Sequence, residues 1–171
     1  MTEPPVHFDR RRPLHWLAFA AGAGMLPGAP GTWGTLAALP LYLLLAGLPL
    51  ALYVGLCVLL FAVGVWVCEQ VGRDIAHRLA PDAAAAPPAH DHPAIVWDEV
   101  VGYLITMTAA PPEPEWMLAG FVLFRLFDIL KPWPVSFIDR QVPGGLGIML
   151  DDGAAAILAG LCLQALIRIL G

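Results

Sequence analysis

The sequence is poor in charged residues, and only one of them is a lysine, Lys131. Charged side chains make up 13% of the 171 residues and hydrophobic ones 58%, whereas a soluble domain carries about a quarter charged residues. No long basic run is present, so we expect no nucleic-acid partner. The three cysteines, Cys57, Cys68 and Cys162, form no CxxC pair and are interpreted as small core residues. The composition therefore predicts an integral membrane protein.

Several catalytic motifs are also absent. A cysteine-based phosphatase needs Cys-x5-Arg, but Cys68 has Asp74 at that position, so Arg73 misses by one residue. There is no Asp-x-Asp nucleophile motif, no GxSxG serine elbow and no Lys-x6-Arg-Pro stretch of the kind that histidine-dependent membrane phosphatases use. These absences exclude the corresponding cysteine, serine and histidine chemistries.

The apolar segments predict an all-α integral membrane protein, a small bundle of about five apolar helices preceded by a short interfacial or re-entrant helix. The short helix is expected at residues 14–26, and the others at residues 36–48, 51–67, 95–110, 116–130 and 148–170. Loops rich in Gly and Pro, or bounded by them, are expected at residues 27–35 and 137–147. Residues 1–13 are predicted to form a cytoplasmic tail. Residues 14–171 then form one membrane-embedded domain with a polar cytoplasmic loop at 69–94.

The basic residues predict the orientation in the membrane. They occupy the tail and two loops, at Arg10, Arg11, Arg12, Arg73, Arg78, Lys131 and Arg140, and basic loops face the cytoplasm. Arg168 is the exception and can snorkel at the far terminus. With this topology, four polar clusters distant in the chain reach the same cytoplasmic depth.

Five of these polar residues are carboxylates flanked by apolar sequence: Asp98, Glu99, Asp128, Asp151 and Asp152. Capping of helix N-termini could explain a single acid, at roughly 0.3–1 kcal/mol each. It does not explain two adjacent pairs, nor Asp128 near a helix C-terminus, where the dipole disfavours an anion. Hard oxygen ligands without Cys or His favour Mg²⁺ or Mn²⁺ over zinc. We therefore expect a divalent metal, with ion pairing as the structural alternative.

The segment from Gly28 to Thr35 is a candidate phosphate-binding loop. Gly31 and Gly34 let a backbone turn closely around an anion, Thr32 and Thr35 offer hydroxyl donors, and the following helix N-terminus adds free N–H groups. The segment is not a P-loop, because it has neither the lysine nor the preceding strand. An ordinary Gly/Pro turn explains the spacing equally well.

Arg125, Asp128 and Lys131 follow each other at intervals of three residues and share a helix face. A local ion pair is the structural interpretation. In the functional interpretation, Asp128 contacts a metal while Arg125 holds a phosphate oxygen and Lys131 adds a point charge.

Four blocks of the sequence, in this order, resemble the bacterial phosphatidylglycerophosphatase A family. They are Pro30-Gly-Thr-Trp-Gly-Thr-Leu36, Val96-Trp-Asp-Glu-Val-Val-Gly102, Phe124-Arg-Leu-Phe-Asp-Ile-Leu-Lys-Pro-Trp-Pro134 and Gly147-Ile-Met-Leu-Asp-Asp-Gly153. The resemblance covers roughly residue 14 to the end, with a mild departure at Gly153-Ala-Ala-Ala156. It implies a Mg²⁺-dependent phosphatase of the bacterial inner membrane that converts phosphatidylglycerophosphate to phosphatidylglycerol. By motif position it places the family's acidic ligands on Asp98, Glu99, Asp128, Asp151 and Asp152.

The expected function is thus metal-assisted hydrolysis of a lipid phosphomonoester on the cytoplasmic face, with a phospholipid of the inner leaflet as partner. Gly31, Thr32, Gly34, Thr35, Arg125 and Lys131 are the expected substrate-binding residues. Either Asp152 or Asp128 is expected to activate water or to attack phosphorus, assisted by Arg125. Residue spacing does not choose between these two carboxylates, and it does not predict an oligomeric state.

The alternative class of protein is a small divalent-cation transporter or channel subunit with an acidic cytoplasmic mouth. A conducting path needs polar groups at several depths, whereas residues 51–67 and 153–166 carry almost none. A lipid phosphotransferase of the CDP-alcohol type would need a different spacing of its acids, which is absent.

Overall fold

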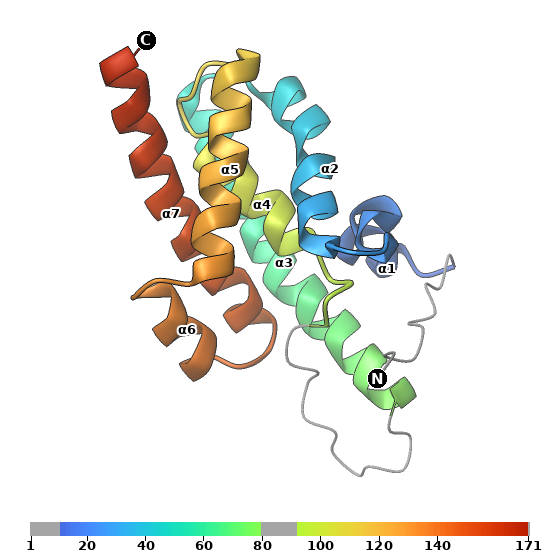
Figure 1. The fold of residues 1–171 in the computed structure, drawn as a ribbon. Helices are drawn as coiled ribbons and strands as arrows, with labels where there is room; N and C mark the ends of the chain where they lie inside the picture. Colours follow the sequence, from blue (N-terminus) through green and yellow to red (C-terminus); the bar gives the residue numbers. More distant parts are fainter. Residues whose placement is uncertain (1–10, 80–91, 171) are drawn as a thin grey trace.

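The computed structural model describes residues 11–79 and 92–170. These residues form helices and no strand, which confirms the all-α class (Figure 1). The helices are α1 (Pro13–Ala18), the 3-10 helix η1 (Ala20–Met25), α2 (Pro30–Leu45), α3 (Leu50–Leu79), α4 (Trp97–Thr106), α5 (Pro114–Leu130), α6 (Val135–Gln141) and α7 (Gly144–Leu170). Residues 82–90 of the expected polar loop lie outside the described part of the chain.

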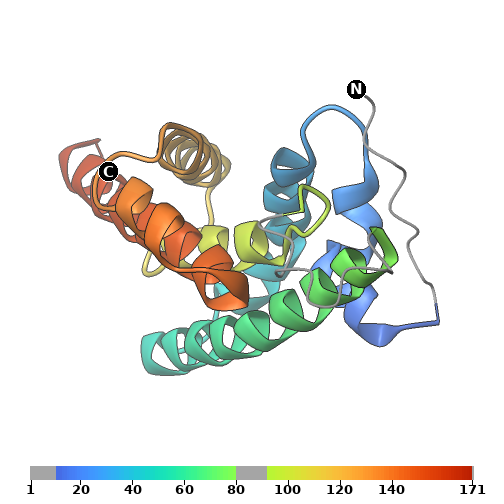
Figure 2. The ribbon, with the colours of Figure 1, turned by 90° about the horizontal axis from the view of Figure 1, so that it is seen from below.

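The short helix α4 lies at the centre of the molecule. Eight of its ten residues are buried, and it packs against α2, α3, α5 and α7. Figure 2 shows these four helices surrounding it. Helix α7 in turn packs along α3, α4, α5 and α6. Polar residues on α4 are therefore held between apolar helices, which fixes their position.

Two of the described helices, α3 and α7, are long and apolar enough to cross a membrane. A spanning helix needs about 20 apolar residues, whereas α2 has 16, α4 has 10 and α5 has 17. The arrangement of about five membrane helices therefore stays a prediction. At the N-terminus, α1 and η1 form the short helical segment that was expected before the bundle.

The expected polar loop at 69–94 begins too early, because α3 continues to Leu79. Val71 and Ile75 on this extension are buried, and Glu69 and Arg73 form an ion pair of 2.7 Å between residues four apart. The extension is thus an amphipathic helix, in which one apolar face and one charged pair stabilise further turns.

The expected loop at 27–35 is also wrong in its second half, because α2 begins at Pro30. Proline suits the first helical position, since the N–H that it lacks would have no helical partner there. Gly34 lies inside the helix, and a Cβ at this position would be 2.7 Å from Cβ of Val96. The glycine is therefore needed for helix packing and not for a turn.

The expected loop at 137–147 contains most of α6 and the start of α7. Gly144 has a positive φ of 71° and forms the turn into α7, and the backbone N–H of Gly145 donates to Oε2 of Glu69 at 2.7 Å. A carboxylate of α3 thus caps the N-terminus of α7. As a result, Asp151 and Asp152 are the eighth and ninth residues of α7 and do not stand at its start, as had been expected.

Candidate active site

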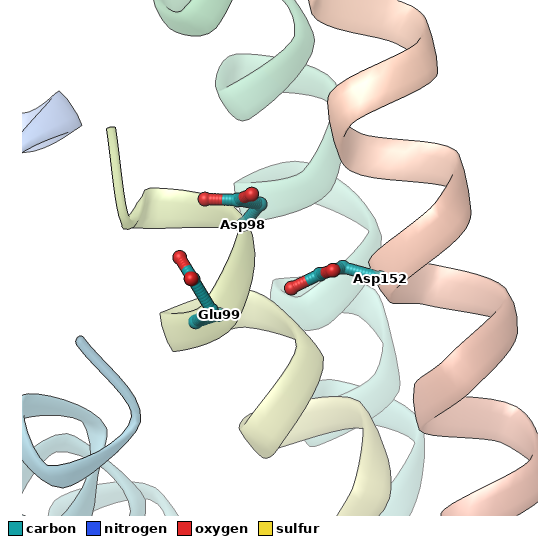
Figure 3. Close-up of side chains that lie close together, drawn as sticks. All are labelled: Asp98, Glu99 and Asp152. Atoms are coloured by element: carbon teal, nitrogen blue, oxygen red, sulfur yellow. The ribbon is translucent and has the colours of Figure 1, made fainter. Parts of the chain in front are cut away.

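Three carboxylates from two helices meet inside the bundle. Asp98 and Glu99 belong to the first turn of α4, and Asp152 reaches them from α7 (Figure 3). One oxygen of each lies within 4.8 Å of the others. Asp98 is 6% exposed and Asp152 4%. The two acids of α4 gain from the helix N-terminus, whose free N–H groups favour negative charge, but Asp152 lies in the middle of a helix and gains nothing from that source.

Small residues allow the helix that carries Asp152 to approach α4. Gly153, Ala155, Ala156 and Ala159 of α7 are buried. Short side chains let two helix backbones come close together, and the Thr106 hydroxyl of α4 lies 3.4 Å from the carbonyl oxygen of Ala156. The small residues after Asp152 therefore position its carboxylate beside those of α4.

The donor set of this cluster fits a hard divalent cation such as Mg²⁺. Among the described residues, Oδ1 of Asp98 and Oδ2 of Asp152 are buried and have no hydrogen-bond partner. Buried polar atoms without a partner are costly, so they point to a missing ligand. In an octahedral Mg²⁺ site, with oxygens at about 2.1 Å, opposite ligands are about 4.2 Å apart. The three oxygens, which lie within 4.8 Å of one another, are near enough to share one ion.

Arg125 lies next to the cluster and contacts two acids. Its Nη1 is 2.5 Å from Oδ2 of Asp128 and 3.7 Å from Oε1 of Glu99. Asp128 in turn neighbours Asp152. The structure thus brings Asp128 to the edge of the cluster, where an arginine offsets its charge and holds it in place.

Asp151 takes a different direction from its neighbour Asp152. Its Oδ2 is 2.5 Å from Nζ of Lys131, and the same ammonium lies 2.6 Å from Oδ1 of Asp139. The structure does not bring Asp151 into the cluster of Asp98, Glu99 and Asp152. Burial acts to lower the pKa of Lys131, but hydrogen bonds to Asp139 and Asp151 outweigh it, so the pKa lies above its usual value.

A cavity of about 300 Å³ opens beside the acids. Its charged lining consists of Asp98, Glu99, Asp128, Asp152, Arg125 and Lys131, and Ala29, Pro30 and Gly31 at the start of α2 form another part of the wall. A Cβ on Gly31 would overlap the Glu99 carboxylate and lie 2.8 Å from a guanidinium nitrogen of Arg125. A larger residue where the first turn of α2 meets the site would thus displace these two side chains.

The other expected phosphate-binding residues are not part of this lining. The Thr35 hydroxyl is buried and donates to the carbonyl oxygen of Gly31 at 2.9 Å. Gly34 packs on Val96. Thr32 is half-buried in the first turn of α2 but does not line the cavity. The start of α2 therefore meets the cavity through its backbone and not through threonine hydroxyls.

Two polar residues near the site were missed by sequence reasoning. Asp139 lies in the segment that was expected to be a loop, and it contacts Lys131 from α6. Glu69 had been assigned to a loop, but it caps α7. The spacing of eight residues between Lys131 and Asp139 spans the end of α5 and the start of α6, and no simple periodicity reveals contacts across such a turn.

Comparison with known proteins relates the chain to one family. Residues 16–167 match the family described as phosphatidylglycerophosphatase A. The phosphatidylglycerophosphatase A of Escherichia coli K12 is 41% identical over 167 residues, which cover 93% of this chain and 90% of the relative. That of Haemophilus influenzae is 40% identical, with 93% of both chains covered. A protein of Bacteroides thetaiotaomicron with the provisional name phosphatidylinositol-3-phosphatase is 33% identical over 80% of this chain and 82% of its own length.

No solved structure matches the chain. The four sequence blocks that resemble the family contain Gly31, Glu99, Arg125 and Asp152, which the structure brings together around one cavity. The family match spans most of the chain, and the identity extends over nearly the full length of the relatives. On this evidence the chain belongs to the phosphatidylglycerophosphatase A family and is a phosphatase.

Proposed function

We propose that this chain hydrolyses the terminal phosphomonoester of phosphatidylglycerophosphate to phosphatidylglycerol and phosphate, with Mg²⁺ as cofactor. The observation that carries the proposal is one cavity lined by acids of α4, α5 and α7, by Arg125 and by the start of α2. Acids for a metal and donors for an anion thus share one space. Relatives named for this activity match over about nine tenths of their length.

Asp98, Glu99 and Asp152 are the proposed metal ligands, with Asp128 next to them. Their support is the spacing of the three carboxylates and the buried oxygens that lack partners among the described residues. Bound in such a site, Mg²⁺ supplies a positive charge that polarises a phosphoryl oxygen and stabilises negative charge in the transition state. Asp151 was expected in the same set of ligands, but its carboxylate contacts Lys131.

The proposed phosphate site consists of Arg125, Lys131 and the first turn of α2. The first N–H groups of a helix have no helical partner and favour an anion, and α2 begins at Pro30, so Gly31 and Thr32 are the first residues to offer such groups. Arg125 adds a guanidinium that can hold two oxygens at once. Glu99 and Asp128 fix its orientation.

Asp128 or Asp152 carries out the proton transfer or the nucleophilic attack in this proposal. One of them takes a proton from the attacking water as the bond from phosphorus to the glycerol oxygen breaks, or its own oxygen displaces that glycerol oxygen from phosphorus and water then hydrolyses the acyl phosphate. Rapid acid quenching of a single turnover with ³²P-labelled substrate separates the two routes. Attack by a carboxylate leaves labelled phosphate on the protein that hydroxylamine releases, whereas direct attack by water labels no protein.

The location that we propose is the bacterial inner membrane, with the site on the cytoplasmic side. Helices α3 and α7 are long enough to span, and we propose that α2, α4 and α5 are embedded beside them. The ends of α3, α5 and α6 that carry Arg73, Lys131 and Arg140 lie at one end of the molecule (Figure 1), as expected if that end faces the cytoplasm. A phospholipid of the inner leaflet then presents its phosphate to the cavity.

Phosphate release from defined lipids tests the proposed substrate. The purified chain in mixed micelles should release phosphate from phosphatidylglycerophosphate in the presence of Mg²⁺. Phosphatidylinositol 3-phosphate and phosphatidic acid serve as matched phosphomonoesters with other headgroups. Faster release from either of these than from phosphatidylglycerophosphate would overturn the substrate assignment.

A further inference from the structure

We propose that Asp151 is a positioning residue for Lys131 and not a metal ligand, and that Lys131, held in this way, presents its ammonium group to the substrate phosphate. This inference rests on the proposed function, because it gives a role to residues at the same cavity. It divides the two adjacent acids of α7 between two tasks, with Asp152 in the metal cluster and Asp151 at the lysine.

The first support is the contact that Asp151 makes. It is 5% exposed, and its Oδ2 lies 2.5 Å from Nζ of Lys131. A buried carboxylate at this distance from an ammonium already has a cationic partner. Asp139 of α6 holds the same ammonium at 2.6 Å. One lysine at the end of α5 thus connects α6 and α7.

The second support is the geometry of α7. Adjacent residues on a helix point about 100° apart, so two neighbouring acids do not face the same group. The Asp152 carboxylate points to Asp98 and Glu99 (Figure 3), whereas the Asp151 carboxylate reaches Lys131. The three-acid cluster does not include Asp151.

The third support is the hydrogen-bonding capacity of Lys131. An ammonium group has three N–H donors, and two of them are directed at Asp139 and Asp151. Lys131 also lines the cavity together with Arg125. Two anchored N–H groups fix the position of the ammonium, and the third remains for an anion in the cavity.

Metal binding without substrate tests the assignment of Asp151. Free Mn²⁺ is measured by EPR during titration of the purified full chain in detergent, for the parent and for D151N, D152N and D139N. D139N removes the other negative charge beside Lys131, and Asp139 is not an expected metal ligand. This variant therefore measures how much Mn²⁺ affinity is lost through the change of charge alone. The Kd of D151N for Mn²⁺ should lie within about threefold of the Kd of D139N. The Kd of D152N should be at least about tenfold higher than that of the parent.

Kinetics of phosphate release test the role in positioning. D151A removes the acceptor for Lys131, whereas D151N keeps an oxygen acceptor, and both remove the same charge. Loss of a charge-assisted hydrogen bond should raise KM for phosphatidylglycerophosphate about fivefold to thirtyfold in D151A, with kcat changed less. KM should rise much less in D151N than in D151A. In the K131M background, adding D151A should change KM little further.

The outcomes separate this inference from the proposed function. If the parent binds Mn²⁺ and D151N weakens binding as much as D152N, Asp151 is a ligand and the inference is wrong. If D151A and D151N raise KM equally, charge and not positioning is responsible, which also overturns it. If the parent binds no Mn²⁺ in the millimolar range, the metal-dependent function itself is wrong. A thermal unfolding scan of each variant shows whether it is folded. If D151A is not folded, the KM test is repeated with D139A, which removes the other, more exposed carboxylate that contacts Lys131.

Discussion

At the scale of single residues, Arg125 has the most demanding position. It contacts Asp128 at 2.5 Å and Glu99 at 3.7 Å through the same nitrogen, and it lines the cavity. The planar guanidinium can keep these contacts and still offer two parallel N–H groups to phosphate, whereas a lysine ammonium has no such parallel pair. Arg125→Lys should therefore lower kcat/KM for phosphatidylglycerophosphate about 100-fold, as expected for loss of a phosphate-orienting donor.

Arg140→Lys is the matched control for this change, because Arg140 is exposed on α6. It should leave kcat/KM within about twofold of the parent, since exposed charge changes have small effects. Equal activity of the Arg125→Lys variant and the parent would remove Arg125 from the phosphate site.

Gly31 offers a second prediction at this scale. A Cβ at this position would overlap the Glu99 carboxylate and approach Arg125, so Gly31→Ala should displace both and reduce kcat at least about tenfold. Gly55→Ala is the control, because a Cβ there meets nothing within 4 Å and lies inside α3. Steady-state phosphate release of both variants checks the prediction. A Gly31→Ala variant as active as Gly55→Ala would show that the site tolerates the side chain.

At the scale of elements, the start of α7 depends on α3. The Glu69 carboxylate accepts the N–H of Gly145 at 2.7 Å and pairs with Arg73 at 2.7 Å. Glu69→Ala should destabilise the protein by about 1–2 kcal/mol, the usual cost of losing a cap, whereas Glu69→Gln keeps an acceptor and should retain most of the stability. Unfolding in detergent by added SDS measures the difference. Equal midpoints for the two variants would exclude the cap.

The packing of α1 on α3 should depend on pH. His15 of α1 is buried, and its Nε2 lies 3.6 Å from Oδ2 of Asp74. Burial, followed by the charge of Arg78, lowers the pKa of His15 below its usual 6.5, although Asp74 opposes this. The folded protein thus binds this proton less readily than the unfolded chain. Stability from the neutral imidazole is present above about pH 6.5 and is lost as the pH falls below it.

Thermal unfolding between pH 7.5 and 5.5 checks this dependence. The melting temperature of the parent should fall over this range by more than that of His15→Gln, which cannot take up the proton. Identical pH profiles of the two proteins would show that His15 does not contribute.

The expected and observed elements differ where glycine and proline were interpreted as residues that interrupt a helix. The long apolar segments predicted α3, α5 and α7 because burial of apolar surface dominates there. Residues 30–35 and 144–147 are helical against that expectation. Pro30 stands at a helix start, and Gly34 and Gly145 lie where another helix comes close. The position of a neighbouring helix is tertiary information, which local propensity does not contain.

At the scale of the whole molecule, the candidate site follows from how α4 is enclosed. It packs against α2, α3, α5 and α7, which bring Gly31, Arg125 and Asp152 to its first turn. The sequence predicted that acids from separate segments meet at one depth, because the basic tail and loops place the ends of those segments on one side. It did not separate Asp151 from Asp152, since the direction of a side chain depends on where the helix begins.

The enclosure of α4 also bears on the transporter alternative. The acids gather beside one cavity at the first turn of α4, and α7 carries no charged residue from Gly153 to Ile167. Gln164 is the one polar amide in this part of α7, whereas an ion path requires polar groups at several depths. The arrangement favours chemistry at one site over conduction.

The central claim is that Asp98, Glu99 and Asp152 hold the divalent ion used to release phosphate from the lipid. Phosphate release measured against Mg²⁺ concentration, for the parent and for Asp98→Asn, Glu99→Gln and Asp152→Asn, tests it most directly. Glu115→Gln is the control, because this exposed acid lies in the first turn of α5, at the opposite end of that helix from Asp128. We predict Mg²⁺-dependent activity in the parent and the control, and loss of at least about 100-fold in each of the three folded variants. Activity that persists in all three, or that is independent of Mg²⁺ in the parent, would contradict the account.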